Sequence, residues 1–297
     1  MSVPRRVALV TGAAQGLGKA IALRLAKDGH HVGLNDLPSK KAVLEDVAHQ
    51  VEQHGVRASV FTGDVTKEND VRATINGAAD ALGGLHVMVA NAGILLPAPF
   101  LDETLQSFNR VTSVSSTGTF LCYQHAGRRM IKEGHGEGRI IGASSYGGKS
   151  PALPGLTSYV AAKYAVRGMT SCAALALGKY GITVNAYAPG LADTPMAVVA
   201  GMKEHAGITL ESWAKSFAIP RHTLPADIAA LVSFLASKES GYITGMYSPD
   251  ASSSFSLTLI NHNHYAGQTV SVLPDVSSPS DLHVLDFRRW RGRYGLG

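Results

Sequence analysis

The sequence contains little cysteine and no long apolar run, and each absence excludes a class of protein. Two cysteines, Cys122 and Cys172, cannot form a disulfide scaffold, so we expect both to be free, buried thiols in a reducing compartment. No stretch of about 18 apolar residues is present to cross a membrane. The apolar run Val7–Val10 follows two arginines, but glycines interrupt it and no cleavage site follows, so it predicts a strand rather than an export signal. We therefore expect a cytoplasmic protein.

Charge is scarce as well, and it is not gathered where a nucleic acid would bind. Charged residues make up 16% of the 297 residues, and 27 basic against 22 acidic side chains leave a net charge of +5. The twelve histidines form no set with cysteine or carboxylate at zinc spacing, so we expect no metal site. We also expect no nucleic-acid partner, because the dense basic cluster is confined to the extreme C-terminus, at Arg288, Arg289, Arg291 and Arg293.

Short apolar runs alternate with helical patterns from residue 3 to about 250. This alternation predicts a parallel β-sheet covered by helices, an α/β fold. The helix after the second run is clear, because Val43, Val47 and Val51 share one face and Gly55 follows. No repeat or linker divides the region, so we expect one domain over residues 1–250. The expected strands are Val7–Thr11, His31–Asn35, Ala58–Thr62, His86–Ala90, Arg139–Ala143 and Thr183–Tyr187.

After about residue 250 the pattern changes. Residues 251–297 are rich in serine, carry scattered Asn and His, and show no period. We expect an atypical C-terminal extension. The sequence leaves open whether it is disordered or packs on a neighbouring subunit.

A glycine-rich turn follows the first expected strand. Residues Thr11 to Gly18 read Thr-Gly-Ala-Ala-Gln-Gly-Leu-Gly, and a helix-forming run continues to Lys27. Glycines there permit a tight turn and let backbone amides approach a pyrophosphate at the helix N-terminus, where the helix dipole favours anions. Three glycines alone are compatible with an ordinary turn. Their place in the first strand–helix–strand unit predicts a dinucleotide site.

Asp36 ends the second expected strand and indicates which dinucleotide binds. A carboxylate there can accept hydrogen bonds from the adenosine ribose hydroxyls and would repel a 2′-phosphate. Gln15 and Leu37 offer no positive charge, although Lys40 and Lys41 are close along the chain. A turn-initiating role for Asp36 is the structural alternative. We expect NAD(H), with NADP(H) as the alternative.

Tyr159 and Lys163 lie four residues apart in a helical run, so their side chains share a face. A phenol titrates near about 10, and a neighbouring ammonium lowers that pKa, which suits an acid/base for carbonyl–alcohol interconversion. The pair alone is weak evidence, because this spacing also arises by chance. Upstream, Ser144-Ser145 follows the strand Arg139–Ala143, where a hydroxyl can reach the crevice at the carboxyl ends of the strands. A helix cap or turn is the commoner use of such a serine.

Further short motifs stand in order along the chain: Asp64-Val65, Asn91-Ala92-Gly93, Asn185, and Pro189-Gly190 with Thr194. With the glycine turn, Asp36, Ser145 and Tyr159-x-x-x-Lys163, they resemble a short-chain dehydrogenase/reductase over roughly residues 3–250. The resemblance implies a doubly wound Rossmann domain of three layers, α/β/α, with a mostly parallel, seven-stranded sheet. It also implies hydride transfer at nicotinamide. The stretches 164–170 and 181–190 are similar to diacetyl/acetoin reductases.

The resemblance implies a role for each site residue. Tyr159 would be the acid/base, Ser145 would hold the substrate oxygen, and Lys163 would bind the nicotinamide ribose and lower the Tyr159 pKa. Mostly apolar positions would line the substrate pocket, namely Leu95, Tyr146, Leu153, Tyr187 and Met196. The expected cofactor contacts are Gly12, Gln15, Gly16, Leu17, Gly18, Asp36, Leu37, Asp64, Val65, Asn91, Ala92, Gly93, Tyr159, Lys163, Pro189, Gly190, Leu191 and Thr194.

The sequence departs from the family pattern in three places. Ser115 stands where the family usually has an Asn whose backbone carbonyl is thought to hold a water linking the lysine to solvent. Any residue supplies a carbonyl, so Ser115 stays a catalytic candidate, in a slower or retuned enzyme. Ser145 and Tyr159 are one residue further apart than is usual, which alters one pocket wall. Asp250-Ala251-Ser252 replaces the usual Asp-Gly-Gly near the last strand.

Two functions follow from these observations. The favoured one is an NAD(P)-dependent oxidoreductase that interconverts a small to medium ketone and its secondary alcohol, either diacetyl/acetoin-like or a secondary-metabolite ketone. The alternative is a cofactor-binding scaffold or sensor of the same fold, with catalysis impaired by Ser115. The resemblance also implies a homo-oligomer, a tetramer or dimer built on the helix of Tyr159 and the helix before it.

Overall fold

The computed structural model describes residues 5–150, 155–196 and 219–249. All of these residues belong to one compact unit of the chain, Met1–Phe255. The expected pocket residue Leu153, the basic C-terminal cluster and the extension 251–297 lie outside the described residues. The domain boundary near residue 250 therefore stays a prediction.

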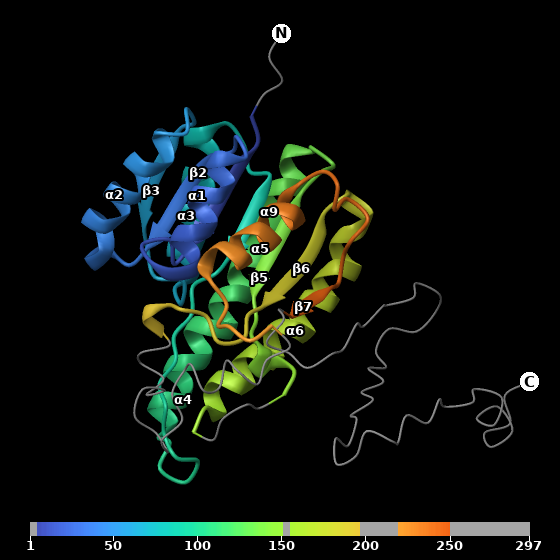
Figure 1. Cartoon of the computed structure of the whole chain (residues 1–297). Coiled ribbons are helices and arrows are strands. Elements are labelled where there is room, and N and C mark those ends of the chain that lie inside the picture. Colours follow the sequence, from blue (N-terminus) through green and yellow to red (C-terminus); the bar gives the residue numbers. More distant parts are fainter. Residues whose placement is uncertain (1–4, 151–154, 197–218, 250–297) are drawn as a thin grey trace, which may run out of the picture. The chain divides into compact units, whose positions relative to one another are not determined.

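Seven parallel strands form one sheet in the order β3-β2-β1-β4-β5-β6-β7 (Figure 1). Every neighbouring pair is parallel, from β1 with β2 to β6 with β7. The six strands expected from the apolar runs are confirmed to within one residue at either end, and the seventh lies at the edge beside β6. The strands are β1 Val7–Thr11, β2 His31–Asp36, β3 Ala58–Thr62, β4 Val87–Ala90, β5 Arg139–Ala143, β6 Thr183–Ala188 and β7 Tyr247–Pro249.

Helices cover both faces of the sheet, which confirms the expected three-layer Rossmann fold. Successive residues of a strand point to opposite faces, so Ala8 and Val10 enter one apolar core while Leu9 enters the other. The first core is closed by α1 (Gly16–Lys27), α2 (Lys41–Glu52) and α9 (Pro225–Ala236). The second is closed by α3 (Glu68–Leu82), α5 (Gly118–Glu133) and α6 (Thr157–Leu177).

A shorter helix, α4 (Leu105–Thr112), leads directly into α5 and also contacts α6. It begins at Thr104, whose hydroxyl accepts a hydrogen bond from the Ser107 N–H (3.1 Å). Between α4 and α5 the chain widens into a π-helical turn, Ser113–Thr117, in which the Gly118 N–H bonds to the Ser113 carbonyl. Such turns are often found at functional sites, and Ser115 lies at the middle of this one.

The two cysteines differ, and one expectation about them is wrong. Cys122 is a buried thiol on α5, as expected, and its burial raises its pKa to about 12. Cys172 is exposed, because the buried side of α6 runs through Val166, Thr170 and Ala174 and residue 172 lies opposite. Within the described part of the chain, no helix has the length and apolarity needed to cross a membrane.

Candidate active site

The turn between β1 and α1 leaves backbone amides free to bind an anion. Gly12 and Gly16 have φ angles of +65° and +56°, a left-handed conformation that favours glycine. A Cβ atom on Gly18 would lie 2.0 Å from the Gly12 carbonyl oxygen, so the turn closes only without a side chain there. The Lys19 N–H bonds to the Gln15 carbonyl (3.2 Å), and the amides before Lys19 have no intrahelical partner. This cradle fits a pyrophosphate.

Asp36 lies at the carboxyl end of β2 and faces this turn. Its Oδ2 accepts a hydrogen bond from the Ala14 N–H (3.1 Å), and its Oδ1 accepts one from the Leu37 N–H (2.9 Å). The side chain is half-buried, and Leu37 beside it is exposed. Two backbone amides therefore fix the carboxylate beside the turn, where a ribose bound to the same turn would meet it.

Asp64 and Val65, expected at the adenine, follow β3. The Asp64 N–H donates to the Asp70 carboxylate (3.0 Å), and Asp64 Oδ1 accepts from the Thr66 N–H and hydroxyl. Burial raises the pKa of Asp64, but the hydrogen bonds from Thr66, with Arg110 nearby, outweigh it, so the net shift is downward and the carboxylate stays charged. Asp70 therefore holds this loop against α3, a role that the sequence did not indicate.

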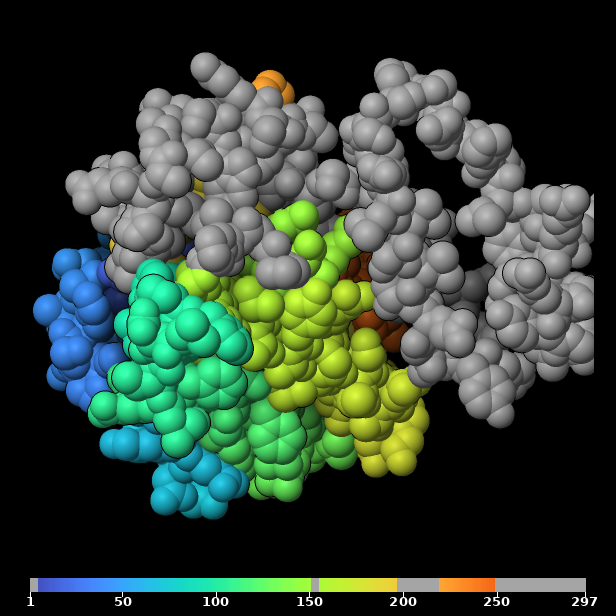
Figure 2. All heavy atoms as spheres, turned by 90° about the horizontal axis from the view of Figure 1, so that it is seen from below, coloured from blue at the N-terminus to red at the C-terminus, as the bar shows by residue number. Residues whose placement is uncertain are grey.

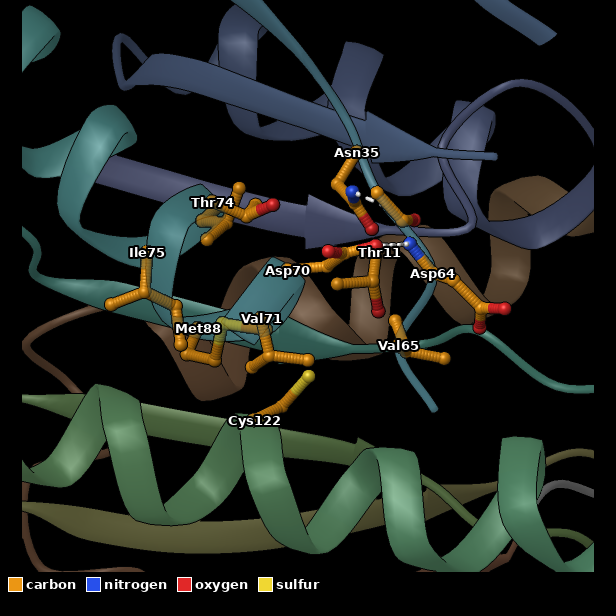
Figure 3. A pocket seen from close by; sticks show the side chains of 12 residues that line it. Thr11, Asn35, Asp64, Val65, Asp70, Val71, Thr74, Ile75, Met88 and Cys122 are labelled. Atoms are coloured by element: carbon orange, nitrogen blue, oxygen red, sulfur yellow. Dashed lines mark hydrogen bonds between the residues drawn. The ribbon is translucent and has the colours of Figure 1, made fainter. Parts of the chain in front are cut away.

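A small cavity lies behind the Asp64 loop, between the sheet and the helices α3 and α5 (Figure 3). Thr11 and Asn35 line it from the sheet, Asp70 from α3 and Cys122 from α5. None of the four expected catalytic residues, Ser115, Ser145, Tyr159 and Lys163, lines it. The cavity therefore lies apart from the expected catalytic residues.

Asn91, at the end of β4, is bonded to the glycine turn and to β6. Its Nδ2 donates to the Thr11 carbonyl (2.9 Å) and the Gly12 carbonyl (3.2 Å), while its Oδ1 accepts from the Tyr187 hydroxyl (2.7 Å). The Thr11 hydroxyl in turn accepts from the N–H groups of Asn91 (3.0 Å) and Ala92 (3.1 Å). The Asn91–Gly93 segment is thus tied to the turn by side-chain and backbone bonds.

Three of the four expected catalytic side chains come together where β5 ends. Ser145 follows β5, and a Cβ atom added to Gly147 would lie 3.6 Å from Ser145 Oγ and 3.8 Å from Tyr159 Cε1, so the serine hydroxyl lies near the Tyr159 ring of α6. Lys163, one helical turn beyond Tyr159, places its Nζ 5.4 Å from the centre of the Tyr159 ring. That Nζ donates to the Ala143 carbonyl (2.8 Å) at the end of β5. A hydroxyl, a phenol and an ammonium therefore lie close together at one edge of the sheet, and their catalytic roles stay a prediction.

The Tyr159 pKa has the opposite direction from the expected one. Burial raises the pKa of the half-buried phenol, and the hydrogen bond from Ser145 offsets only part of that rise. Lys163 is buried, and burial lowers its own pKa to about 8. Its ammonium bonds to a carbonyl oxygen and lies over the ring, not against the phenol oxygen. In this arrangement the phenol keeps its proton at neutral pH.

Ser115 is fully buried in the π-helical turn, and its hydroxyl has two partners. It accepts a hydrogen bond from the Ile94 N–H (3.1 Å) and donates one to the Ile94 carbonyl (3.2 Å). A Cβ atom on Gly93 would lie 3.4 Å from both the Ser115 hydroxyl and the Lys163 Nζ, so Ser115 borders the catalytic lysine. The Ser115 carbonyl accepts from the Thr119 hydroxyl (3.2 Å). Ser115 is therefore held by hydrogen bonds in a buried position near Lys163.

The segment after β6 adjoins both halves of the site. The Pro189 carbonyl accepts from the Tyr146 N–H (2.8 Å) and, more weakly, from the Ser145 hydroxyl (3.5 Å). A Cβ atom on Gly16 would lie 3.6 Å from Thr194, which places Thr194 against the glycine turn. Gly190 lies between these contacts and is half-buried. The segment thus connects the glycine turn with Ser145.

The expected pocket residues do not all lie at a surface. Tyr146 and Met196 are half-buried. Tyr187 is wrong as a pocket residue: it is 0% exposed, packs in the first apolar core and bonds to Asn91. The expectation failed because alternate residues of β6 face opposite ways and β6 is covered on both faces. The expected pocket residue Leu95 and the expected cofactor contact Leu191 are buried, each 7% exposed, while the cofactor contact Leu17 is partly buried against the first core.

Two supporting residues escaped the sequence analysis. The Ser144 hydroxyl donates to the Lys163 carbonyl (2.9 Å), which ties α6 to the end of β5. The Tyr247 hydroxyl on β7 donates to the Ser145 carbonyl. A serine next to a catalytic serine carries no signal of its own, and the partner of Tyr247 is far away in the sequence. Both contacts require knowledge of the sheet order.

This chain is similar in sequence and in fold to known proteins. The family profile described as Enoyl-(Acyl carrier protein) reductase matches residues 12–248. A short-chain dehydrogenase/reductase of Armillaria gallica is 48% identical over 81% of this chain and 92% of its own. A diacetyl reductase [(S)-acetoin forming] of Staphylococcus aureus is 39% identical over 81% of this chain and 94% of its own. The crystal structure of acetoin dehydrogenase YohF from Salmonella typhimurium superposes with a TM-score of 0.73 at 36% identity, over 82% of this chain and 94% of that one.

Proposed function

Because the chain belongs to the short-chain dehydrogenase/reductase family of oxidoreductases, we propose that it reduces a small ketone with NADH, or oxidises the matching secondary alcohol with NAD⁺. The observation that carries this proposal is the meeting of Tyr159, Ser145 and Lys163 at the end of β5, beside a glycine turn built for an anion. Both halves of a hydride-transfer site lie at one edge of the sheet.

The residues at this edge fit a nicotinamide dinucleotide. The amides that begin α1 would hold the pyrophosphate, Asp36 the adenosine ribose, and Asp64 and Val65 the adenine. When bound, the dinucleotide supplies or accepts the hydride. The fixed carboxylate of Asp36 supports NAD(H) over NADP(H), because a 2′-phosphate would meet it at close range.

Ser145 and Tyr159 share the work on the substrate oxygen. The Gly147 N–H donates to Ser145 Oγ (3.1 Å) and occupies one lone pair, while the serine proton is held only by the long contact with the Pro189 carbonyl (3.5 Å) and can be donated to a substrate. In ketone reduction Ser145 would donate a hydrogen bond to the carbonyl oxygen, and Tyr159 would transfer its proton to that oxygen. In alcohol oxidation the same phenol oxygen would accept the proton.

The pKa directions set the sign of the pH dependence. Reduction needs protonated Tyr159, so its rate is highest below the Tyr159 pKa and falls as the pH rises through it. Burial raises that pKa, which extends reduction toward alkaline pH. Oxidation needs the phenolate and rises with pH. Lys163, with a pKa of about 8, carries its full positive charge only below that pH.

The substrate class follows from the apolar neighbours and from the relatives. Leu95, Tyr146 and Met196 contribute no charge, which supports a small uncharged ketone. Relatives carry the names diacetyl reductase and acetoin dehydrogenase. We therefore place diacetyl and acetoin first among the candidates, and ketones of secondary metabolism second.

A homo-oligomer is also part of this proposal. The face made by α4, α5 and α6 lies together at the surface in Figure 2. It exposes large apolar side chains, including Phe120, Tyr164 and Leu175, the last at 72%. Such side chains favour contact with a second copy. Light scattering during size-exclusion chromatography should give a dimer or tetramer, and a monomer at all concentrations would contradict this.

The alternative, a scaffold with impaired catalysis, rested on Ser115. The Ser115 hydroxyl accepts a hydrogen bond from the Ile94 N–H and donates one to the Ile94 carbonyl, so no buried polar group is left without a partner there. We therefore retain the enzyme.

The proposal is tested by mixing the full chain with NADH or NADPH and a panel of ketones while following absorbance at about 340 nm. Diacetyl, acetoin and bulkier cyclic and aryl ketones make up the panel, and the alcohols with NAD⁺ test the reverse reaction. We expect turnover with NADH and at least one small ketone. No turnover with any ketone or alcohol would overturn it.

A further inference from the structure

Tyr187 is a buried phenol that the mechanism above does not use. It lies at the end of β6, is 0% exposed, and donates from its hydroxyl to Asn91 Oδ1 (2.7 Å). Burial raises its pKa far above the usual value, so the phenol keeps its proton. It is therefore a hydrogen-bond donor at every physiological pH.

This donor decides which way the Asn91 amide faces. A carboxamide has an acceptor on one side and a donor on the other, and only one orientation satisfies both. With Tyr187 donating to Oδ1, the Nδ2 group must face the carbonyls of Thr11 and Gly12, and it bonds to both. The link runs from β6, past β5, to the end of β4 and on to β1, at the carboxyl edge of the sheet.

The Gly12 carbonyl held by this amide is the atom on which the cofactor turn closes. A Cβ atom on Gly18 would lie 2.0 Å from the Gly12 carbonyl oxygen and 2.6 Å from Asn91 Nδ2. The first turn of α1 therefore rests against the pair that the phenol holds in place. A shift of the Asn91 amide would therefore shift the first turn of α1 and the backbone amides at its N-terminus.

We propose that Tyr187 is a positioning residue for the dinucleotide-binding turn: it orients Asn91, which fixes the Gly12 carbonyl against Gly18. This inference rests on the proposed function, because it assumes that the turn binds a nicotinamide dinucleotide. Its consequence is preorganisation. Without the phenol hydroxyl, Asn91 Oδ1 is left unpaired, the turn populates other arrangements, and the apparent affinity falls with the fraction that stays competent.

The matched pair Tyr187→Phe and Tyr123→Phe tests it. Tyr123 is also buried, at 3% exposure, and its hydroxyl bonds to the Thr170 hydroxyl (3.0 Å) between α5 and α6. Each variant loses one buried phenol hydroxyl, but only one hydroxyl contacts Asn91. Binding of NADH to the full chain is measured by fluorescence titration, and thermal unfolding is measured in parallel.

We expect Tyr187→Phe to weaken NADH binding about fivefold to tenfold, the weight of one buried hydrogen bond. The rate at saturating NADH should stay within about twofold, because chemistry does not involve Tyr187. Tyr123→Phe should lower the melting temperature to a similar degree and leave NADH affinity unchanged. Unchanged affinity in Tyr187→Phe, or an equal loss in both variants, would overturn the inference.

Hydrogen exchange supplies a readout that needs no cofactor. In the protein alone, Tyr187→Phe should speed amide exchange in the segment 12–19, and Tyr123→Phe should not. If the wild-type chain binds neither NADH nor NADPH, the proposed function fails, and exchange still decides whether Tyr187 holds the turn. Amide exchange in the segment 12–19 that is as slow in both variants as in the wild type would overturn the inference by itself.

A double-mutant cycle with Asn91→Ala tests whether the two side chains act through one link, and Asn91→Ala alone tests the link if Tyr187→Phe does not fold. Asn91→Ala removes the same link from the other side. We expect the double variant to bind NADH no more weakly than Asn91→Ala alone. Additive losses of affinity would show that Tyr187 acts elsewhere and would contradict the inference.

Discussion

The two halves of the site are held in place by different means. In the dinucleotide half, on β1 to β3, the backbone itself has the required shape: Gly12 and Gly16 adopt positive φ angles, and Gly18 has no room for a Cβ atom. In the catalytic half, on β4 to β6, side chains hold the backbone of another element in place, as when the Ser144 hydroxyl donates to the Lys163 backbone carbonyl. A single substitution in the first half should therefore remove most of the cofactor binding. A single substitution in the second half should lower the activity only in part.

The largest expected effect is that of Gly18→Ala. The added Cβ atom would lie 2.0 Å from the Gly12 carbonyl oxygen and 2.6 Å from Asn91 Nδ2, so the turn must shift. We expect NADH binding to weaken between about tenfold and a hundredfold, in line with an overpacking cost of about 1–3 kcal/mol. Fluorescence titration measures it. Gly168→Ala is the control, since no atom lies within 4 Å of its added Cβ.

That control should bind NADH normally and should be more stable by up to about 1 kcal/mol, because alanine has a higher helix propensity than glycine. If Gly18→Ala bound NADH as tightly as the wild type, the turn would not be the cofactor site. The contrast between the two halves would then be lost.

Asp36→Asn has the next largest effect and acts on cofactor choice. The amide oxygen can still accept the bond from the Ala14 N–H, but the negative charge is gone. We expect the preference for NADH over NADPH to fall roughly tenfold, since the charge repels a 2′-phosphate at close range. The kcat/KM ratio for the two cofactors measures it.

Asp46→Asn, an exposed charge on α2, should leave the cofactor ratio unchanged. An unaltered ratio in Asp36→Asn would mean that Asp36 only shapes the turn. The remaining basis for preferring NAD(H) would then disappear.

Substitutions of Ser115 test whether a change in the catalytic half lowers the activity only in part. Ser115→Ala leaves the Ile94 N–H and carbonyl without their partner, so we expect kcat to fall several-fold and stability to fall by about 1–2 kcal/mol. Ser115→Asn should give no gain in activity, because the hydroxyl already satisfies Ile94 and the site is fully buried. Steady-state kinetics and denaturant unfolding measure both variants, with Ser116→Ala as control. A large rise in activity in Ser115→Asn would restore the idea of impaired catalysis.

The smallest effect is expected at the amino end of the sheet, away from the site. His86 accepts a bond from the Val7 N–H (3.1 Å) and stacks on His135 at 4.5 Å. Burial, and then the charges of His135 and Arg6, lower its pKa to about 4. The folded protein therefore binds this proton less readily than the unfolded chain, and stability is lost as the pH falls from about 6.5 toward 4.

His86→Gln should reduce this loss and leave NADH affinity unchanged at neutral pH. Denaturant unfolding at about pH 7.5, 6 and 5 measures the difference. An identical pH dependence in the variant would show that other groups carry the proton linkage.

The sequence predicted the dinucleotide half better than the catalytic half, for a physical reason. A positive φ or a missing Cβ demands glycine at a fixed place, so the turn and its helix were visible in Gly12 to Gly18. The strands were equally visible, because parallel strands covered on both faces need continuous apolar runs. β7 has only three residues, too short for such a run.

The catalytic half depends on contacts between residues far apart in the chain. The sequence predicted that Tyr159 and Lys163 share a helix face. The Ala143 carbonyl, which accepts the hydrogen bond from Lys163 Nζ, can be identified only when the position of β5 beside α6 is known. Tyr187 was misplaced for the same reason, since its partner Asn91 is on another strand. The direction of the Tyr159 pKa was missed because burial cannot be read from spacing.

The central claim is that Tyr159 exchanges the proton with the substrate oxygen, and Tyr159→Phe tests it most directly. Turnover of a ketone identified with the wild-type enzyme is compared with NADH affinity in the same preparation. The account predicts that kcat falls at least about a hundredfold, the usual weight of acid/base catalysis, while NADH affinity stays within about threefold. A variant that keeps most of its turnover would contradict the claim.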